Sequence, residues 1–420
     1  MERLAIDPSA RRRPRNRSFA ARLPIILAVM LGLVIFSGLQ ASAAPTNAAN
    51  LQKLAGLSIV PKAARINYQD YQQWVNIYPS AYANWKPPAG RVKICATTFY
   101  LGNTFQQENE VAMANEVKAA AKAGWAKPGF TFLNSNNSTA TAISQFQSEV
   151  QDGCNVIFAG SSISTTAFCP LLKNAYNKGI LVFSGSENCN YDVDLQFAVY
   201  QTQYNLAKGL AQIMHNKGNV IIEQGVPGIA DAETATAANF AVFKKHPGIH
   251  VVGQIPGDWT ASVASTATAQ WLSTHPTKVD GIMDQGAMGV AAEQALTSAG
   301  RPLAKVSLQE SDCQELAFDK DHPGLVGYLA DQAPGPGVYA DFYVLKAMLN
   351  GQKPKLDTIV YPIPGPTKAT FNQWYTSSMT ESSACFASPA PAVPALKTYL
   401  PQFLTGGTPV AGLPIPTYNK

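Results

Sequence analysis

An Asp-Trp pair at the end of an apolar segment is the most informative chemical feature of the sequence. Residues 218–259 read as a strand, a glycine-rich turn, a helix and a second strand, which ends in Gly257-Asp258-Trp259. A carboxylate accepts hydrogen bonds from hydroxyl groups, and an indole offers a flat face for the C–H side of a sugar or polyol. The alternative is that Trp259 covers a hydrophobic core and that Asp258 caps the next helix. The residue types therefore indicate either a polyol site or a capped core.

Polar and aromatic residues also follow the other predicted strands. Amides and carboxylates mixed with aromatic rings suit a neutral polyhydroxylated ligand better than a phosphate or a lipid. Solvation of loops explains the polarity of such positions but not the aromatic residues among them. The first half contributes Phe99, Tyr100, Asn103, Phe105, Ser161, Ser162, Ser186, Glu187 and Asn188, and the second half contributes Glu223, Gln224, Asp284, Gln285, Gln309, Glu310, Asp331 and Gln332.

Motifs for enzymatic chemistry are missing from the sequence. It contains no G-x-S-x-G elbow, P-loop or H-E-x-x-H motif. His246 and His250 have Pro247-Gly248 between them, which prevents a shared helical face for a metal. Asp258 and Glu233 are candidates for the carboxylate pair of a secreted glycoside hydrolase, but their spacing adds no support. We therefore expect a protein that is not an enzyme, with no cofactor and no metal.

Short apolar strands alternate with helical segments from Val92 to about Asn350. This alternation predicts βαβ units and parallel sheets covered on both faces. A chain of 420 residues exceeds the size of one core, and the alternation restarts near residue 200. The predicted fold class is therefore α/β, with two doubly wound parallel-sheet lobes. Ligands bind such sheets at the carboxyl ends of the strands, so two facing lobes would enclose one cleft.

The N-terminal 43 residues resemble a cleavable secretory signal. Seven arginines precede an apolar run from Leu23 to Leu39, and Ala41-Ser42-Ala43 matches a cleavage site. An uncleaved membrane anchor is the alternative. The formal charge is +5, but acidic and basic residues balance once this segment is removed. We therefore expect a periplasmic protein that binds neither nucleic acid nor an anionic membrane.

Six cysteines follow the signal segment, and in an exported protein they permit disulfides. Cys169 and Cys189 flank two successive strand-to-helix connections and are a candidate pair. Cys313 and Cys385 are a second candidate pair, which would tie the C-terminal region to the second lobe. Cys95 and Cys154 lie in or beside apolar strands and are as well explained as buried thiols.

The domain boundaries follow from changes in pattern and composition. Residues 1–43 are the signal peptide, and residues 44–90 form an N-terminal leader. Residues 91–199 with about 333–358 form the N-terminal lobe, and residues 200–332 with about 359–385 form the C-terminal lobe. Residues 386–420 are a Pro-rich extension, which we expect to be wrapped around the protein or mobile.

Five short segments, in order, resemble the type I periplasmic solute-binding proteins, in particular the ribose-binding branch. The resemblance covers roughly residues 91–360. The five segments correspond to the family's Asn-Pro-Phe-Phe, Gly-Ile-Pro-Val-Val, Gly-x-x-Gly and Pro-Gly-Ile…Asp-Trp patterns and to the strand that returns toward the first lobe. They are Asn103-Thr104-Phe105-Gln106, Gly179-Ile180-Leu181-Val182-Phe183, Gly225-Val226-Pro227-Gly228, His246-Pro247-Gly248-Ile249 with Gly257-Asp258-Trp259, and Leu329-Ala330-Asp331-Gln332.

The resemblance implies two lobes joined by a three-strand hinge, with a sugar held between them by polar side chains and aromatic rings. Phe105, together with Gln106, and Trp259 would flank the ligand. The hydrogen-bonding positions would be Asn103, Gln285 or Gly286, Gln309 or Glu310, and Asp331. Further candidates for contacts with the ligand are Tyr100, Ser186, Glu187 and Glu233.

The sequence departs from the family at two of its basic positions. Ser186-Glu187 replaces an Asp-Arg pair, and Glu233 or Thr234 stands where the family has another Arg. Arginine donates several hydrogen bonds, whereas an ionised Glu only accepts them. The pocket therefore cannot hold a pentose in the family's usual way, and the two glutamates favour a ligand rich in donors. The alternative is that both start helices outside the cleft.

The resemblance implies the receptor component of an ABC-type importer, which binds a sugar or sugar-like solute by hinge closure. The expected partners are this small molecule and an inner-membrane ABC permease, and we expect a monomer. A periplasmic ligand sensor that presents its closed form to a membrane signalling kinase is the alternative, because both functions use the same fold.

Overall fold

The computed structural model describes residues 56–68, 77–160, 165–184, 190–362, 364–387 and 393–410. The predicted signal segment lies outside the described residues, and so do Ser186, Glu187 and Cys189. Among the described residues, none of the helices is both long enough and apolar enough to span a bilayer. Residues 44–420 form one compact unit, to which the following description applies.

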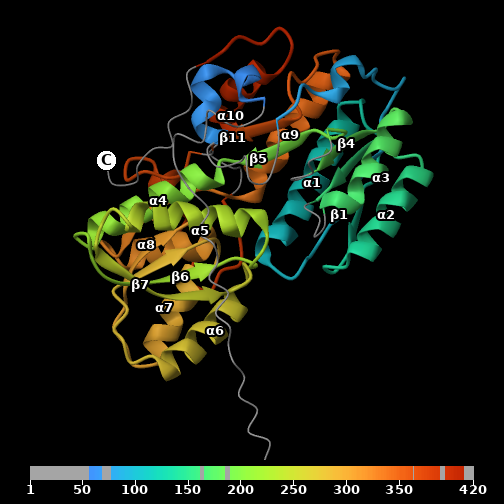
Figure 1. The fold of residues 1–420 in the computed structure, drawn as a ribbon. Coiled ribbons are helices and arrows are strands. Elements are labelled where there is room, and N and C mark those ends of the chain that lie inside the picture. The colour runs from blue at the N-terminus through green and yellow to red at the C-terminus, as the bar shows by residue number, and fades with distance from the viewer. Residues whose placement is uncertain are drawn as a thin grey trace, which may run out of the picture. The chain divides into compact units, whose positions relative to one another are not determined.

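The N-terminal lobe is built on a four-stranded parallel sheet with the strand order β2-β1-β3-β4 (Figure 1). Every residue of the central strands β1 and β3 is buried, as expected where helices cover both faces of a parallel sheet. The elements are β1 (Ile94–Thr98), α1 (Thr104–Lys122), β2 (Thr131–Asn134), α2 (Thr139–Gln151), β3 (Val156–Ala159), α3 (Thr165–Asn177) and β4 (Leu181–Ser184).

The C-terminal lobe is built on a five-stranded parallel sheet with the order β10-β9-β8-β6-β7. Helix α4 approaches β10 so closely that a Cβ atom at Gly209 would lie 2.8 Å from the carbonyl oxygen of Gly327. The elements are α4 (Val199–Ile213), β6 (Lys217–Gln224), α5 (Ala230–Phe243), β7 (Gly248–Pro256), α6 (Ala261–Thr274), β8 (Gly281–Asp284), α7 (Gly289–Ser298), β9 (Lys305–Leu308), α8 (Cys313–Asp321) and β10 (Val326–Leu329).

Three connections join the lobes. The first and third pass through β5 (Asp194–Phe197) and β11 (Thr358–Tyr361), which pair in parallel as a separate two-stranded sheet. The second leads from β10 to α9 (Pro334–Leu349), whose apolar side chains join the core of the N-terminal lobe. The predicted α/β fold with two doubly wound lobes is therefore confirmed.

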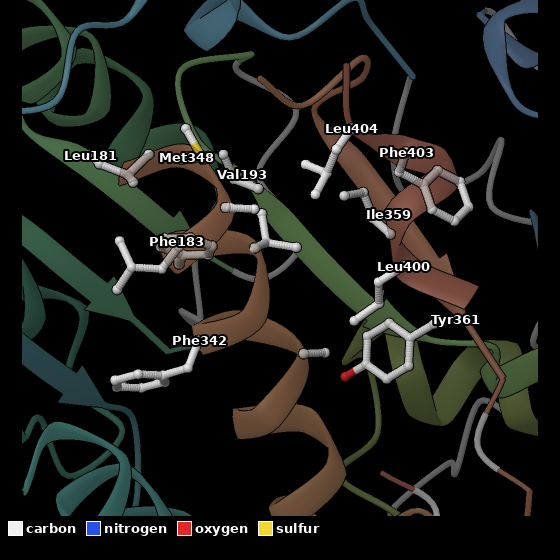
Figure 2. Packing of buried hydrophobic residues seen from close by; sticks show 14 of the residues in the cluster. Leu181, Phe183, Val193, Phe342, Met348, Ile359, Tyr361, Leu400, Phe403 and Leu404 are labelled. Carbon is white, nitrogen blue, oxygen red and sulfur yellow. The ribbon is translucent and has the colours of Figure 1, made fainter. Parts of the chain in front are cut away.

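Segments from both ends of the chain add to the N-terminal lobe. The leader contributes Tyr68, whose hydroxyl donates to the carbonyl of Thr358 at 2.9 Å. The C-terminal region contributes α10 (Val393–Tyr399), and the Tyr399 hydroxyl donates to the carbonyl of Val360 at 3.0 Å. Figure 2 shows Leu400, Phe403 and Leu404 beside residues of β11 in this core. Both segments thus pack against β11.

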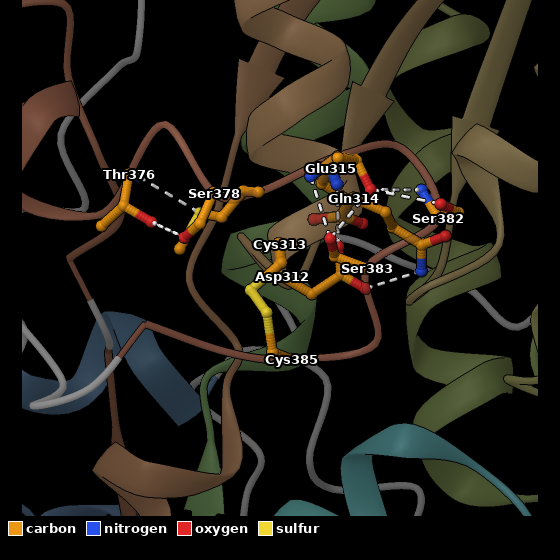
Figure 3. The surroundings of a disulfide bond; sticks show 11 residues. Asp312, Cys313, Gln314, Glu315, Thr376, Ser378, Ser382, Ser383 and Cys385 are labelled. Carbon is orange, nitrogen blue, oxygen red and sulfur yellow. Dashed lines mark hydrogen bonds between the residues drawn. A yellow bond between two sulfur atoms is a disulfide. The ribbon is translucent and has the colours of Figure 1, made fainter.

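Two disulfides lie among the described residues. Cys313 and Cys385 form one, with their Cα atoms 5.2 Å apart (Figure 3). Cys95 and Cys154 form the other, with their Cα atoms 6.1 Å apart. The interpretation of Cys95 and Cys154 as buried thiols is therefore wrong, because the connection after α2 returns Cys154 to β1. Cys169 is also disulfide-bonded.

Candidate functional site

The carboxyl ends of β7, β8 and β9 converge on Gly286. A Cβ atom at this position would lie 2.8 Å from Glu310 Oε1, 3.2 Å from Trp259 Cδ1 and 3.6 Å from Gln309 Nε2. Gly286 also has a φ of +127°, which L side chains rarely adopt. Glycine therefore permits an aromatic ring, a carboxyl and an amide to meet at one point of the C-terminal lobe.

Trp259 is fixed at this junction by its backbone and by its ring. Asp258 and Trp259 have φ values of 54° and 52°, so the turn after β7 is left-handed at two consecutive non-glycine residues. The indole N–H donates to the carbonyl of Gln285 at 2.9 Å, and the ring lies against Gly225, where a Cβ atom would be 2.2 Å from Cε2. The side chain is half-buried, which leaves part of the ring open to a ligand.

Asp258 does not cap the next helix. Its side chain is exposed, and the N-cap residue of α6 is Thr260, which makes no side-chain capping hydrogen bond. Trp259 packs in part against Ala264, Met288 and Ala291. The alternative that Trp259 covers a hydrophobic core is therefore correct for part of the side chain.

Two buried carboxyl groups face the same end of the sheet. Glu310 and Asp331 are 4% and 3% exposed, and Glu310 Oε2 and Asp331 Oδ2 have no hydrogen-bond partner. Burial raises the pKa of Asp331 to about 7, although the neighbouring indole N–H of Trp374 opposes this shift. Burial, followed by the neighbouring Asp312, Asp284 and Asp331, raises the pKa of Glu310 well above its usual range. The unpartnered oxygens can thus serve hydroxyl or amino groups of a ligand.

A layer of buried polar side chains holds these turns in place. The Asp284 carboxylate accepts hydrogen bonds from the backbone N–H groups of Gly286 at 3.0 Å and Gln309 at 3.1 Å. Glu315 Oε2 accepts from the N–H groups of Glu310 at 2.9 Å and Ser311 at 2.6 Å. Glu315 was not among the residues predicted from the sequence, although an acidic residue in the first turn of the helix after β9 could have indicated it.

Gln285 belongs to this supporting layer. It is 1% exposed, its side-chain oxygen accepts from the N–H of Gly225 at 3.1 Å, and its amide donates to Thr236 Oγ1 at 2.9 Å. The structure therefore brings Gln285 beside Trp259 and Glu310, with its side chain engaged in joining β8 to the turn after β6.

The predicted residues of the N-terminal lobe gather at the start of α1. Asn103 caps this helix by accepting from the N–H of Gln106 at 2.9 Å, and the Gln106 side chain accepts from Thr98 Oγ1 at 2.9 Å. Tyr100 is half-buried, with its ring against Gly102. Phe105 makes edge-to-face contacts with Phe197 and Phe386.

The side chain of Glu233 contacts the turn after β6 and not the residues around Gly286. It stands in the first turn of α5, and its Oε1 accepts from the backbone N–H of Gly228 at 3.0 Å. This contact is that of a helix-start residue, the alternative raised from the sequence. Ser186 and Glu187 lie outside the described residues.

The buried acids do not form a metal site in the part of the chain that the structure describes. No group of three or more His, Cys, Asp or Glu side chains there has an arrangement that could hold a metal ion. Backbone N–H groups donate to both oxygens of Asp284 and to Oε2 of Glu315.

Glu223, at the carboxyl end of β6, makes the folding stability depend on pH. It is fully buried, and burial raises its pKa to about 8, although Thr268 Oγ1 donates to it at 2.8 Å. The folded state holds this proton more tightly than the unfolded state, so the contribution is present at pH 4–5 and is lost as the pH rises to about 8. We expect Glu223→Gln to make the decline of unfolding free energy between pH 5 and 8.5 shallower, by up to about 1.4 kcal/mol per pH unit.

Guanidinium unfolding at several pH values measures this difference. Asp321→Asn, at an exposed residue at the end of α8, is the control and should keep the wild-type slope. Equal slopes for Glu223→Gln and the wild type would show that Glu223 is ionised in the folded protein.

A comparison with protein families assigns residues 97–353 to the periplasmic binding protein domain. The chain belongs to this family. Among curated proteins, the xylitol-binding protein of Mycolicibacterium smegmatis is 26% identical over 172 residues, which are 40% of this chain and 49% of the relative. The chain thus matches about half the length of that relative.

Solved structures show the same fold. A solute-binding protein of an ABC transporter from Thermobispora bispora matches 78% of this chain and 99% of its own, with a TM-score of 0.67 and 20% identity. A solute-binding protein from Bacillus halodurans with bound myo-inositol matches 66% of this chain and 94% of its own, with a TM-score of 0.55 and 18% identity. These solved structures share the fold of this chain at 20% and 18% identity.

Proposed function

We propose that this protein is the extracytoplasmic receptor of an ABC-type importer and that it binds a sugar or another polyol between its two lobes. The observation that carries the proposal is the junction at Gly286, where the half-buried ring of Trp259 meets the buried carboxyl of Glu310. An aromatic face beside unpartnered oxygens matches the alternating C–H and O–H surfaces of a polyol. Tyr100, Asn103, Phe105, Gln106 and Asp331 complete the proposed site.

The names of related proteins support the ligand class. One relative is called a xylitol-binding protein, and solved structures of the same fold contain myo-inositol or D-allose. These three are uncharged and rich in hydroxyl groups. A ligand of this kind supplies the donor that Glu310 Oε2 lacks.

Hinge closure is the proposed mechanism. Closure lets a ligand touch both lobes at once, so that ligand binding shifts the population toward the closed form, which would dock on the permease. The β5–β11 pair and the β10–α9 connection are the segments where such a motion would occur. The protein would be exported by means of the predicted signal peptide. It would then act as a monomer and would release its ligand unchanged.

A thermal-shift screen of the mature protein against xylitol, D-allose, myo-inositol and D-ribose tests the proposal. At a polyol concentration 100 times its Kd, we expect stabilisation of about 2.7 kcal/mol and a clear rise in Tm. Isothermal titration should then give one site per chain, and chromatography should recover the polyol unchanged. The polyol assignment is contradicted if no polyol or sugar raises the Tm, and the receptor assignment if the ligand is consumed.

A further inference from the structure

Phe386, a residue in the C-terminal part of the chain, contacts the predicted ligand residue Phe105. Their ring centroids are 6.4 Å apart and their planes are at 87°, an edge-to-face arrangement. Phe105 lies in the first turn of α1 in the N-terminal lobe. Ala387, next to Phe386, packs against the core of the C-terminal lobe. The contact therefore joins side chains that are anchored in different lobes.

Two features fix the backbone of Phe386 to the C-terminal lobe, a disulfide and an antiparallel bridge. Cys385 is bonded to Cys313 at the start of α8, and the N–H of Cys313 donates to the carbonyl of Cys385 at 2.8 Å (Figure 3). This hydrogen bond is part of the antiparallel bridge between Phe386 and Asp312. Asp312 is in turn two residues from Glu310, so Phe386 stands close to the proposed polyol site.

The contact continues to the hinge through two more aromatic rings. Phe105 meets Phe197 at 6.4 Å, and Phe197 meets Tyr361 at 5.5 Å. Phe197 and Tyr361 are paired residues at the ends of β5 and β11. A continuous row of four rings thus runs from the disulfide-anchored segment, past the start of α1, to two of the connections between the lobes.

We propose that Phe386 is an interlobe latch, a positioning residue that holds the ring of Phe105 and sets the equilibrium between lobe arrangements. A motion that separates the lobes must break the Phe386–Phe105 contact, whereas Phe105–Phe197 can persist. The contact is made within the protein, so this inference goes beyond the proposed function and needs no ligand. An aromatic pair of this kind changes such an equilibrium by roughly two- to tenfold.

Small-angle scattering and hydrogen exchange of the ligand-free protein test the latch. We expect Phe386→Ala to increase the radius of gyration and to raise amide exchange in β5 and β11 about two- to tenfold. Phe386→Tyr keeps the ring and should restore wild-type values. Phe371→Ala is the matched control, because Phe371 lies in the same segment of the chain but stacks on Tyr375. If Phe386→Ala matches this control in both measurements, the latch does not exist.

Removing the anchor gives an independent readout. Cys313→Ala/Cys385→Ala leaves the ring of Phe386 in the chain but removes the covalent link that anchors its backbone, and we expect the exchange in β5 and β11 to rise as in Phe386→Ala. Adding Phe386→Ala to the double variant should then have little further effect. Fully additive effects would overturn the role of the disulfide in the latch. A failed polyol screen would refute the proposed function and leave these ligand-free results standing.

Discussion

Trp259→Ala is expected to lower the affinity for the best polyol of the screen by roughly 30-fold or more. The substitution removes the aromatic face of the site, and buried aromatic anchors commonly account for 2 kcal/mol or more of binding free energy. It also leaves the carbonyl of Gln285 without its indole donor and opens space against Gly225. Isothermal titration well below the Tm of the variant measures the effect.

Two further variants separate the role of the ring in binding from its role in folding. Trp259→Phe keeps an aromatic face without the N–H group and should bind better than Trp259→Ala. Trp271→Ala removes a tryptophan that stacks on His275 and lies beside Gly253, so its affinity should equal that of the wild type. An unchanged affinity in Trp259→Ala would show that Trp259 is only a core residue and that the site lies elsewhere.

Cys95→Ala/Cys154→Ala should destabilise the N-terminal lobe by about 4 kcal/mol. The disulfide closes a loop with a sequence separation of 59, and a cross-link over that span removes roughly this much chain entropy from the unfolded state. Both residues are 2% exposed, so the lost sulfur contacts add to the effect. Guanidinium unfolding followed by circular dichroism provides the measurement.

Ile157→Val is the control for packing in the same place. Ile157 is the register partner of Cys95 on β3, and its loss of one methylene should cost about 1 kcal/mol. If the double alanine variant costs no more than this control, the link between β1 and the end of α2 contributes no cross-linking stability.

The positions of the candidate site along the chain follow from a local pattern. Apolar strands separated by helical segments predict parallel sheets. In a parallel sheet, the residues that come directly after each strand all lie at the same edge. Trp259, Gln285, Glu310 and Asp331 were found from the sequence for this reason. Asn103 and Phe105 follow the first strand in the same pattern, and the resemblance to the family implied their roles in holding the ligand.

The roles of these residues required the positions of their neighbours. Gln285 and Glu310 look equivalent in the sequence, since each is a polar residue after a strand. In the structure, the Gln285 side chain is bonded to Gly225 and Thr236, whereas one oxygen of Glu310 has no partner. Glu233 likewise required its contact with Gly228 before its place at a helix start was evident.

The sequence by itself determined the α/β class, the two lobes and the strand ends at which a ligand site had to lie, because these depend on the spacing of neighbouring residues. Only the tertiary structure decided the Cys95–Cys154 bond, the orphaned oxygens of Glu310 and Asp331, and the meeting of Phe386 with Phe105. Such features join residues far apart in the chain. Their formation depends on which distant segments the packed cores bring together, and no local spacing encodes that choice.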